Sequence, residues 1–356
     1  MSSALAVART RFTLPDELHA AQPPEARGLA RDEVRLLVAT PGGLEHARFR
    51  DLTNFLHPGD LVVVNTSATL PAALDGIRSG GRPVAVHFSS PIVDDRYVVE
   101  LRAPDGPLRD ASVGEIVHLA GGMRIEVLAG HPDRARSVGS RLWRARVEVE
   151  GRIEDHLDRY GRPITYSYSD ERWPLSDYQT IFARHPGSAE MPSAARPFTH
   201  ELVTRLIVGG VAFAPLLLHT GVSSLEIGEP PQDERFEVPP STARLVNHTR
   251  AAGGRVVAVG TTVTRALETV ARPDGTVVAA RGRTDLVLDL GRRARVVDAL
   301  ITGWHAPQAS HLSLLESVAG SALVQRAYDA AIEAGYLWHE FGDGCLLMPK
   351  ARSGGR

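Results

Sequence analysis

Residues 254–268 place hydroxyl and guanidinium groups where a strand gives way to a helix. The apolar run Val256–Val259, flanked by glycines, is typical of a buried parallel strand. Thr261 and Thr262 then begin a helix whose first backbone N–H groups lack partners within it, and Arg265 follows one turn later. A helix start beside an arginine can hold a carboxylate or a phosphate, so we predict an anion site here. An ordinary strand–helix unit with a surface arginine explains the same residues equally well.

Polar residues follow three other predicted strands at their carboxyl ends. Asn65 and Thr66 follow one apolar run, His219 follows another, and His305 comes after a third. Because α/β folds bind ligands at the carboxyl ends of their parallel strands, we expect these groups to converge on one cleft. Either histidine can act as a general base or acid near neutral pH. A partly buried histidine that packs against a strand end is the competing explanation for each.

Three weaker candidates lie elsewhere in the chain. Asp298 falls within an apolar strand pattern, where a carboxylate either pairs with an arginine or takes part in chemistry. Tyr178, Gln179 and Thr180 precede a polar loop of the kind that closes over ligands, although a solvated connection has the same composition. An arginine cluster could contact a phosphate backbone or form a solvated edge. That cluster comprises Arg281, Arg283, Arg292, Arg293 and Arg295.

The composition is that of an ordinary globular chain long enough for two domains. Of its 356 residues, 43% are hydrophobic and 23% are charged, and the net charge is −2. A polyanionic partner would therefore need a local basic patch. The single cysteine, Cys345, excludes an internal disulfide; no histidine or cysteine pair has a metal-ligand spacing, and no Walker-type loop is present. No apolar run approaches a membrane span, so we expect a cytoplasmic protein.

The order of the predicted elements indicates an α/β protein with an inserted β module. Helix and strand patterns alternate in residues 1–75 and 155–356, which predicts a main domain with a mixed or mainly parallel sheet. Residues 76–154 instead contain short alternating segments separated by Gly, Pro and Asp clusters, typical of a small antiparallel β-barrel or sandwich. The expected main-domain strands cover 34–38, 61–64, 211–218, 254–260, 295–301 and 345–348, and the expected helices 49–56, 200–208, 241–252, 312–319 and 322–333.

Motifs of the expected cleft recur as a set over nearly the whole chain. They are PGDLVVVNT (58–66), LPA (70–72), YQT (178–180), PGS (186–188), PSA (192–194) with Phe198, EVP (237–239), VAVGTT (257–262) with Arg265, VVDALIT (296–302), His305 with Pro307, and FGD (341–343). This set resembles one known family, the S-adenosylmethionine:tRNA ribosyltransferase-isomerases of queuosine biosynthesis.

The resemblance implies that S-adenosylmethionine, as cosubstrate, gives up its ribosyl group rather than its methyl group. The acceptor is the aminomethyl group of a 7-deazaguanine base in tRNA; adenine and methionine leave, and no metal takes part. The sulfonium acidifies the C5′ hydrogens, so the enzyme needs a base, a proton donor for adenine and an anchor for the methionine carboxylate. His219 or His305, with Asp298, suits the proton transfers, and Arg265 beside Thr262 suits the anchor. The remaining predicted cosubstrate residues are Asn65, Thr66, Tyr178, Gln179, Thr180 and Thr261.

The chain departs from the family pattern at polar positions of the expected cleft. The family usually has arginines where this chain has Ala68 and Ala73. Its Gly-Leu-His-Phe and Met-His-Ser-Glu segments are replaced here by residues 195–198 and 231–234, and each loses a histidine. Two alternatives to action on tRNA therefore stay open: an S-adenosylmethionine-dependent enzyme with a small-molecule or other non-tRNA acceptor, and a binding paralogue without turnover.

Overall fold

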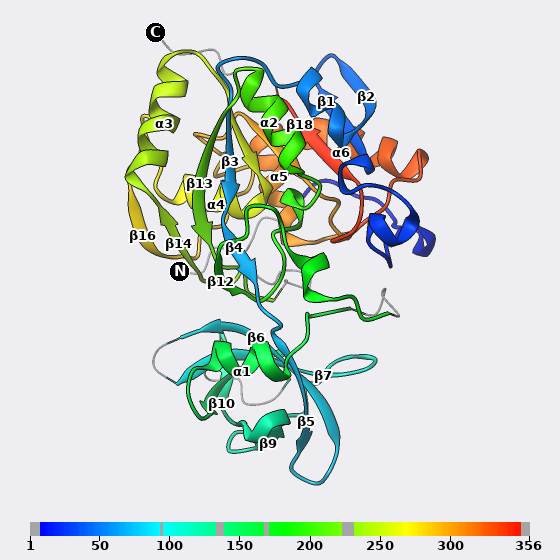
Figure 1. Ribbon diagram of the computed structural model, residues 1–356, viewed down its shortest axis with the longest axis vertical. Coiled ribbons are helices and arrows are strands. Elements are labelled where there is room, and N and C mark those ends of the chain that lie inside the picture. Colours follow the sequence, from blue (N-terminus) through cyan, green and yellow to red (C-terminus); the bar gives the residue numbers. More distant parts are fainter. Residues whose placement is uncertain (1–7, 93–94, 133–138, 167–170, 223–230, 350–356) are drawn as a thin grey trace.

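The computed structural model describes residues 8–92, 95–132, 139–166, 171–222 and 231–349. Figure 1 shows two bodies, a large α/β domain and, below it in the view, a smaller β-barrel. The mixed sheet of the first and the antiparallel pairing of the second confirm the predicted fold class. Among the described residues, none of the helices has both the length and the apolar character needed to cross a bilayer.

The main sheet has nine strands with mixed pairing. In sheet order they are β16 (Ala280–Thr284), β14 (Glu234–Val238), β13 (Ala212–Leu218), β3 (Leu61–Asn65), β15 (Val256–Val259), β17 (Ala299–Thr302), β18 (Gly344–Leu347), β1 (Arg35–Thr40) and β2 (Gly43–Arg48). The centre, β13–β3–β15–β17, is parallel, and β1 is parallel to β18. All other neighbouring pairs are antiparallel. The carboxyl ends of the four central strands therefore meet at one edge, where α/β folds bind ligands.

Helices cover both faces of this sheet, which explains why its central strands are apolar without alternation. The helices are α2 (His200–Val208), α3 (Pro240–Ala251), α4 (Gly260–Thr269), α5 (Ser310–Ala319), α6 (Ser321–Glu333) and the 3₁₀ helix η4 (Phe49–Asn54). In β3, Leu61 and Val63 pack into a core with α3 and α4, while Val62 and Val64 pack into a second core with α2 and η4. Each such fully buried aliphatic side chain contributes about 1.5–3 kcal/mol.

Most predicted main-domain elements are present, with two informative differences. The strand expected over 295–301 is only Ala299–Thr302, because the backbone N–H groups of 295, 296 and 297 all donate to the Glu268 carboxylate instead of a strand. The helix expected over 49–56 is a 3₁₀ helix that ends at Asn54. Strands β2, β14 and β16 were not predicted. Further short 3₁₀ helices are η1 (Asp16–Leu18), η2 (Pro24–Arg27), η3 (Arg31–Glu33), η5 (Ala120–Gly122), η6 (Leu175–Tyr178) and η7 (Ser193–Ala195).

The inserted module is a closed antiparallel barrel. Its strands are β5 (Ala73–Arg78), β6 (Pro83–Pro91), β7 (Arg96–Ala103), β9 (Ile116–Leu119), β10 (Arg124–His131) and β11 (Leu142–Glu148), with the short β8 (Gly106–Pro107) beside β7. The barrel closes because β11, at one end of the strand order, pairs with β7 as well as with β10, so β11 has no open edge. Its core includes Val86, Leu101 and Trp143, all fully buried.

Two connections join the barrel to the main domain. The first connection contains β4 (Ser67–Thr69), which pairs in parallel with β12 (His185–Ser188). The first barrel strand begins at Ala73, and the helix α1 (Ile153–Tyr160) contributes Ile153 and Leu157 to the barrel core. The exact domain limits, drawn from the sequence at 75/76 and 154/155, stay a prediction.

Candidate active site

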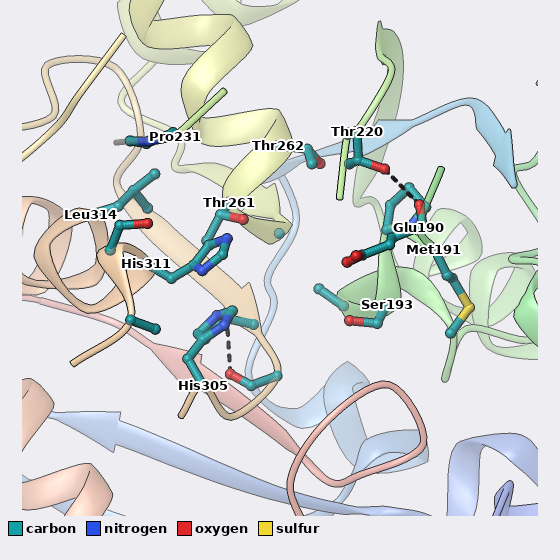
Figure 2. Close-up of a pocket in the computed structure, with 18 of the residues that line it drawn as sticks. Glu190, Met191, Ser193, Thr220, Pro231, Thr261, Thr262, His305, His311 and Leu314 are labelled. Carbon is teal, nitrogen blue, oxygen red and sulfur yellow. Dashed lines mark hydrogen bonds between the residues drawn. The ribbon is translucent and has the colours of Figure 1, made fainter. Parts of the chain in front are cut away.

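A cavity of about 400 Å³ lies at the carboxyl ends of the central strands. Residues that follow β13, β15 and β17 form part of its wall, so three of the four predicted strand ends meet here. Other sides are formed by segments 190–194 and 286–288 and by the first residues of α5. Arg102 of the barrel and Tyr166, which packs against the barrel core, also line the cavity. Figure 2 shows many of these side chains around the open space. Among the described residues, no cluster of three or more His, Cys, Asp or Glu side chains could hold a metal ion.

The first turn of α4 lines the cavity with Gly260, Thr261 and Thr262. Gly260 has φ +89°, a conformation that glycine adopts without strain, and a Cβ there would lie 3.3 Å from Ala194. No side chain caps this turn at Val259. The backbone N–H groups and the two threonine hydroxyls are therefore the polar groups that the first turn of α4 brings to the cavity.

Asn65 positions this turn without lining the cavity. Its Nδ2 donates to the Leu218 carbonyl at 2.8 Å and to Thr262 Oγ1 at 3.3 Å, while its Oδ1 accepts from the Leu218 and Ser67 backbone N–H groups. The amide thus connects the ends of β3 and β13 to the start of α4. Thr66 is also outside the cavity, where its hydroxyl donates to the Leu216 carbonyl at 3.0 Å.

Arg265 lies in the cavity wall, but its guanidinium is committed to the protein. It donates to the Leu286, Gln232 and Thr284 carbonyls at 2.9–3.1 Å and pairs with the Glu234 carboxylate. Those four bonds use four of the five N–H donors of an arginine. Residues on or beside β14 and β16 therefore take most of the donors of Arg265, and its role as a carboxylate anchor stays a prediction.

His305 and His311 lie on one side of the cavity, with their rings stacked at a centroid distance of 4.5 Å and an interplanar angle of 7°. A hydrogen bond joins His305 Nε2 to Thr302 Oγ1 at 3.1 Å, as Figure 2 shows. Burial, and then the neighbouring His311 and His339, lower the pKa of His305 well below its ordinary value. Burial likewise lowers the pKa of His311 to about 4. Both rings are therefore neutral at pH 7 and able to accept a proton.

A second histidine pair lines the cavity nearby. His19 Nδ1 and His339 Nε2 are hydrogen-bonded at 2.6 Å, and the two rings stack at 4.7 Å. Burial, and then the neighbouring His19, lower the pKa of His339 to about 4. This pair comes from chain segments 320 residues apart. Sequence spacing therefore carried no signal for it.

Glu190 extends into the cavity from the opposite side. Figure 2 shows its side chain directed from the Met191–Ser193 wall toward the side where His305 and His311 lie. Its carboxylate accepts a hydrogen bond from the Tyr166 hydroxyl, and its backbone carbonyl accepts one from Thr220 Oγ1 at 2.6 Å. A carboxylate and a pair of neutral imidazoles thus face one another across the space.

His219 follows β13 as expected but is not part of the cavity wall. Its Nδ1 is hydrogen-bonded to Ser67 Oγ at 2.7 Å, and its ring packs directly against Gly187, where an added Cβ would lie 2.5 Å away. Burial, with the charges of Arg235 and His185, lowers the pKa of His219 to about 4. These contacts fit the competing explanation, a histidine that packs at a strand end, and the catalytic role of His219 stays a prediction.

The other sequence candidates also lie outside the cavity. Asp298 precedes β17 at its amino end, where its Oδ2 accepts from the Val256 N–H at 3.0 Å, so it sits at the opposite edge of the sheet. Tyr178 packs on Phe341 at a ring distance of 5.0 Å. The Gln179 side chain exchanges hydrogen bonds with the Thr69 backbone, and Thr180 Oγ1 accepts from the Phe182 N–H. In the structure these residues hold loops and strands together outside the cavity, and their predicted roles in the site stay predictions.

Sequence reasoning missed several residues of the wall. His311 could have been found, because it lies six residues beyond His305 near the start of a predicted helix. Glu190 follows the PGS motif that was singled out. Nothing in the local sequence indicates Arg102 or Tyr166, since only the packing of the barrel against the main domain brings them to the cavity.

Comparisons with known proteins agree over nearly the full chain. Residues 7–347 match the family described as "Queuosine biosynthesis protein". A relative from Symbiobacterium thermophilum, named S-adenosylmethionine:tRNA ribosyltransferase-isomerase, is 36% identical and aligns over 95% of this chain and 98% of its own length. A protein of the same name from Gloeobacter violaceus is 34% identical over 96% and 95%. The crystal structure of S-adenosylmethionine tRNA ribosyltransferase from Thermotoga maritima is similar with a TM-score of 0.52 and 27% identity, covering 95% of this chain and 99% of that one.

Proposed function

This chain belongs to the queuosine biosynthesis family of S-adenosylmethionine:tRNA ribosyltransferase-isomerases, and we propose that the cavity at the carboxyl ends of β13, β15 and β17 is where it binds S-adenosylmethionine. The enzyme transfers and isomerises the ribosyl group of S-adenosylmethionine, with a 7-aminomethyl-7-deazaguanine base in tRNA as the acceptor. Adenine and methionine are the other products. The reaction therefore requires a base near C5′ and polar groups that hold the nucleoside.

His305 is the proposed base. A sulfonium stabilises negative charge on the adjacent carbon, so a ring nitrogen of His305 can take the C5′ proton while the electron pair stays on C5′ as an ylide. The neutral state of the imidazole supports this role, because only an unprotonated ring can accept the proton. The hydrogen bond to Thr302 and the stack on His311 limit the orientations available to the ring.

The nucleoside is proposed to bind at the first turn of α4. The hydroxyls of Thr261 and Thr262 and the backbone N–H groups of this turn are donors that suit ribose oxygens and adenine nitrogens. Figure 2 places Thr261 and His311 close to one another in the view, on the same side of the space as His305. A ribose held at α4 would therefore present C5′ toward the histidine pair. The single observation that carries the proposal is this juxtaposition of a neutral His305 with the start of α4 in one cavity.

The tRNA is proposed to approach along β16. This strand is the last of the sheet, its residues Ala280–Arg283 are exposed, and the chain continues from it into 286–288 of the cavity wall. Arg281 and Arg283 thus form a basic edge beside the cavity, although Arg283 also pairs with Asp233. Lysine and arginine side chains at such edges contact phosphates without reading sequence. Action on tRNA also supports the proposal of a cytoplasmic enzyme.

Release of adenine tests the proposal. The protein is incubated with S-adenosylmethionine alone, with unmodified tRNA, and with tRNA that carries 7-aminomethyl-7-deazaguanine. We expect adenine and modified tRNA in equal amounts, and only with the last substrate. Adenine release that needs no tRNA would indicate another acceptor, and S-adenosylmethionine binding without any release would indicate a paralogue without turnover; either result would overturn the tRNA reaction.

A further inference from the structure

Arg102 is the cation that the barrel brings to the cavity. It lies on β7, its side chain is 11% exposed, and its guanidinium carbon is 5.2 Å from the centre of the Tyr166 ring. Within the described residues it donates one hydrogen bond, from Nη1 to Glu100 Oε2 at 3.2 Å. The contact with the Tyr166 ring and the bond to Glu100 together restrict the orientations of the guanidinium.

Arg102 and Arg265 both line the cavity, but among the described residues Arg102 keeps most of its side-chain N–H donors for a ligand, whereas Arg265 keeps a single one. Arg265 uses four N–H groups on protein acceptors, as described above. Arg102 uses one of its five, and Glu100 does not depend on it alone, because Arg141 Nη1 donates to Glu100 Oε1 at 2.7 Å. Burial raises the pKa of Glu100, but His87, Arg141 and Arg102 outweigh it and hold that pKa at about 2. Glu100, held by Arg141, is thus a charged acceptor that orients the Arg102 guanidinium.

A carboxylate is placed on the same chain of contacts. The ring of Tyr166 lies against the Arg102 guanidinium, and its hydroxyl donates a hydrogen bond to the Glu190 carboxylate. The Glu190 side chain extends into the cavity. Burial and the nearby Glu190 raise the pKa of Tyr166 far above its ordinary value, so the phenol stays a donor. Arg102 and Glu190 therefore present opposite charges from one rigid unit, with a single tyrosine between them.

We propose that Arg102 and Glu190 bind the α-amino-acid group of S-adenosylmethionine, with Arg102 on the carboxylate and Glu190 on the ammonium. Adjacent opposite charges match a zwitterion, whereas Glu190 would repel the phosphate that an arginine alone could bind. This inference rests on the proposed function and adds that the inserted barrel completes the cosubstrate site. The nucleoside end then lies at α4 and the histidine pair, and the methionine end lies toward the barrel.

Affinities for truncated ligands test the assignment. S-adenosylmethionine and its decarboxylated analogue, which keeps the sulfonium and the amine, are titrated by calorimetry into the wild type and into Arg102→Met. We expect the variant to lose about 10- to 100-fold in affinity for S-adenosylmethionine, the range for a charge-assisted hydrogen bond, and little for the analogue. Equal losses for both ligands, or no loss, would overturn the role of Arg102.

Glu190 is tested in the same way with the 2-oxo analogue, which keeps the carboxylate but replaces the ammonium-bearing carbon with a ketone. Glu190→Gln should lose its preference for S-adenosylmethionine over this analogue, while an unchanged preference would contradict contact with the ammonium. Arg124→Met, which removes an exposed barrel arginine paired with Glu148, is the matched control and should bind both ligands like the wild type. If the wild type binds no S-adenosylmethionine at all, the proposed function fails, which is a different result from loss of selectivity.

Folding is checked on the same proteins. Arg102→Lys keeps the charge beside Glu100 but not the planar fork, so it should unfold like the wild type and bind S-adenosylmethionine more weakly. Selective weakening in this folded variant would support the assignment, and wild-type affinity would refute it.

Discussion

His305 and His311 stack face to face in the cavity, six residues apart in sequence but on different elements, one after β17 and the other in the first turn of α5. Both imidazoles stay neutral in this arrangement, because the buried, low-dielectric surroundings disfavour the charged form of either ring. A ring that begins neutral and is held by Thr302 suits a base that must accept a proton from carbon.

Replacing His305 by glutamine should slow turnover strongly while binding persists. The amide keeps a hydrogen-bonding group near Thr302 but cannot accept the C5′ proton, so we expect kcat for adenine release to fall by about 10²- to 10⁴-fold. Calorimetric titration with S-adenosylmethionine should give nearly the wild-type affinity. Undiminished adenine release would assign the proton transfer to another group.

The buried histidines should make the fold acid-sensitive in a defined window. The pKa values of His219, His311 and His339 are lowered to about 4, against about 6.5 in an unfolded chain. The unfolded state then binds more protons between these values, so stability is fully present above about pH 6.5 and is lost as pH falls toward 4. Urea midpoints measured from pH 8 to pH 5 should be flat at first and then decline.

A matched variant assigns part of that decline. His311→Gln removes one of the depressed groups, so its midpoint should fall less steeply than that of the wild type below pH 6.5. A wild-type midpoint that stays constant down to pH 5 would show that these rings are protonated in the folded protein.

The parts of the site that depend on local pattern could be predicted, and the parts that depend on β14 and β16 could not. The β15–α4 junction follows from four buried residues, a glycine and two threonines, all contiguous. The partners of Arg265 lie on or beside β14 and β16, and β16 has the sequence ARGRT, in which four of five residues are exposed. Such a strand carries no hydrophobic alternation, so nothing local indicates that it will cover the arginine.

The direction of a side chain at a strand end was equally hidden. His219 and His305 each follow an apolar strand, and their sequence contexts do not distinguish them. What separates them is that Gly187 of β12 packs against the His219 ring, whereas the residues after β17 stay open to the cavity. Since β12 pairs with β4 across more than 100 residues of sequence, only tertiary structure decides which histidine lines the cavity.

Arg265→Met should damage the fold rather than only the binding site. Removing the guanidinium leaves the Glu234 carboxylate buried opposite an apolar side chain and frees three carbonyls, so we expect a loss of about 3–5 kcal/mol in the free energy of unfolding. Urea denaturation of the wild type, Arg265→Met and Arg265→Met with Glu234→Gln gives the comparison, and the double variant should recover part of the loss. A fully stable Arg265→Met that has lost only S-adenosylmethionine affinity would support the anchor predicted from the sequence.

Gly187→Ala should displace His219 and, through it, the residues after β13. The new methyl would lie 2.5 Å from the His219 ring. The Nδ1 atom of this ring is hydrogen-bonded to Ser67 Oγ, which is hydrogen-bonded to Ser188 Oγ at 2.6 Å. Ser188 Oγ in turn accepts a hydrogen bond from the Thr220 N–H. Overpacking of this kind costs about 1–3 kcal/mol, measured as a lower urea midpoint, and affinity should also fall because Thr220 lines the cavity.

Combining that change with His219→Ala separates the clash from the loss of the glycine itself. A smaller side chain at 219 makes room for the methyl group. The loss of unfolding free energy in the double variant should therefore be smaller than the sum of the losses in the two single variants. Additive losses would mean that the backbone at Gly187, which has φ +156°, and not the contact with His219, requires glycine. In that case His219 would be a bystander, and the chain of hydrogen bonds from Ser67 to Thr220 should survive its removal with S-adenosylmethionine affinity unchanged.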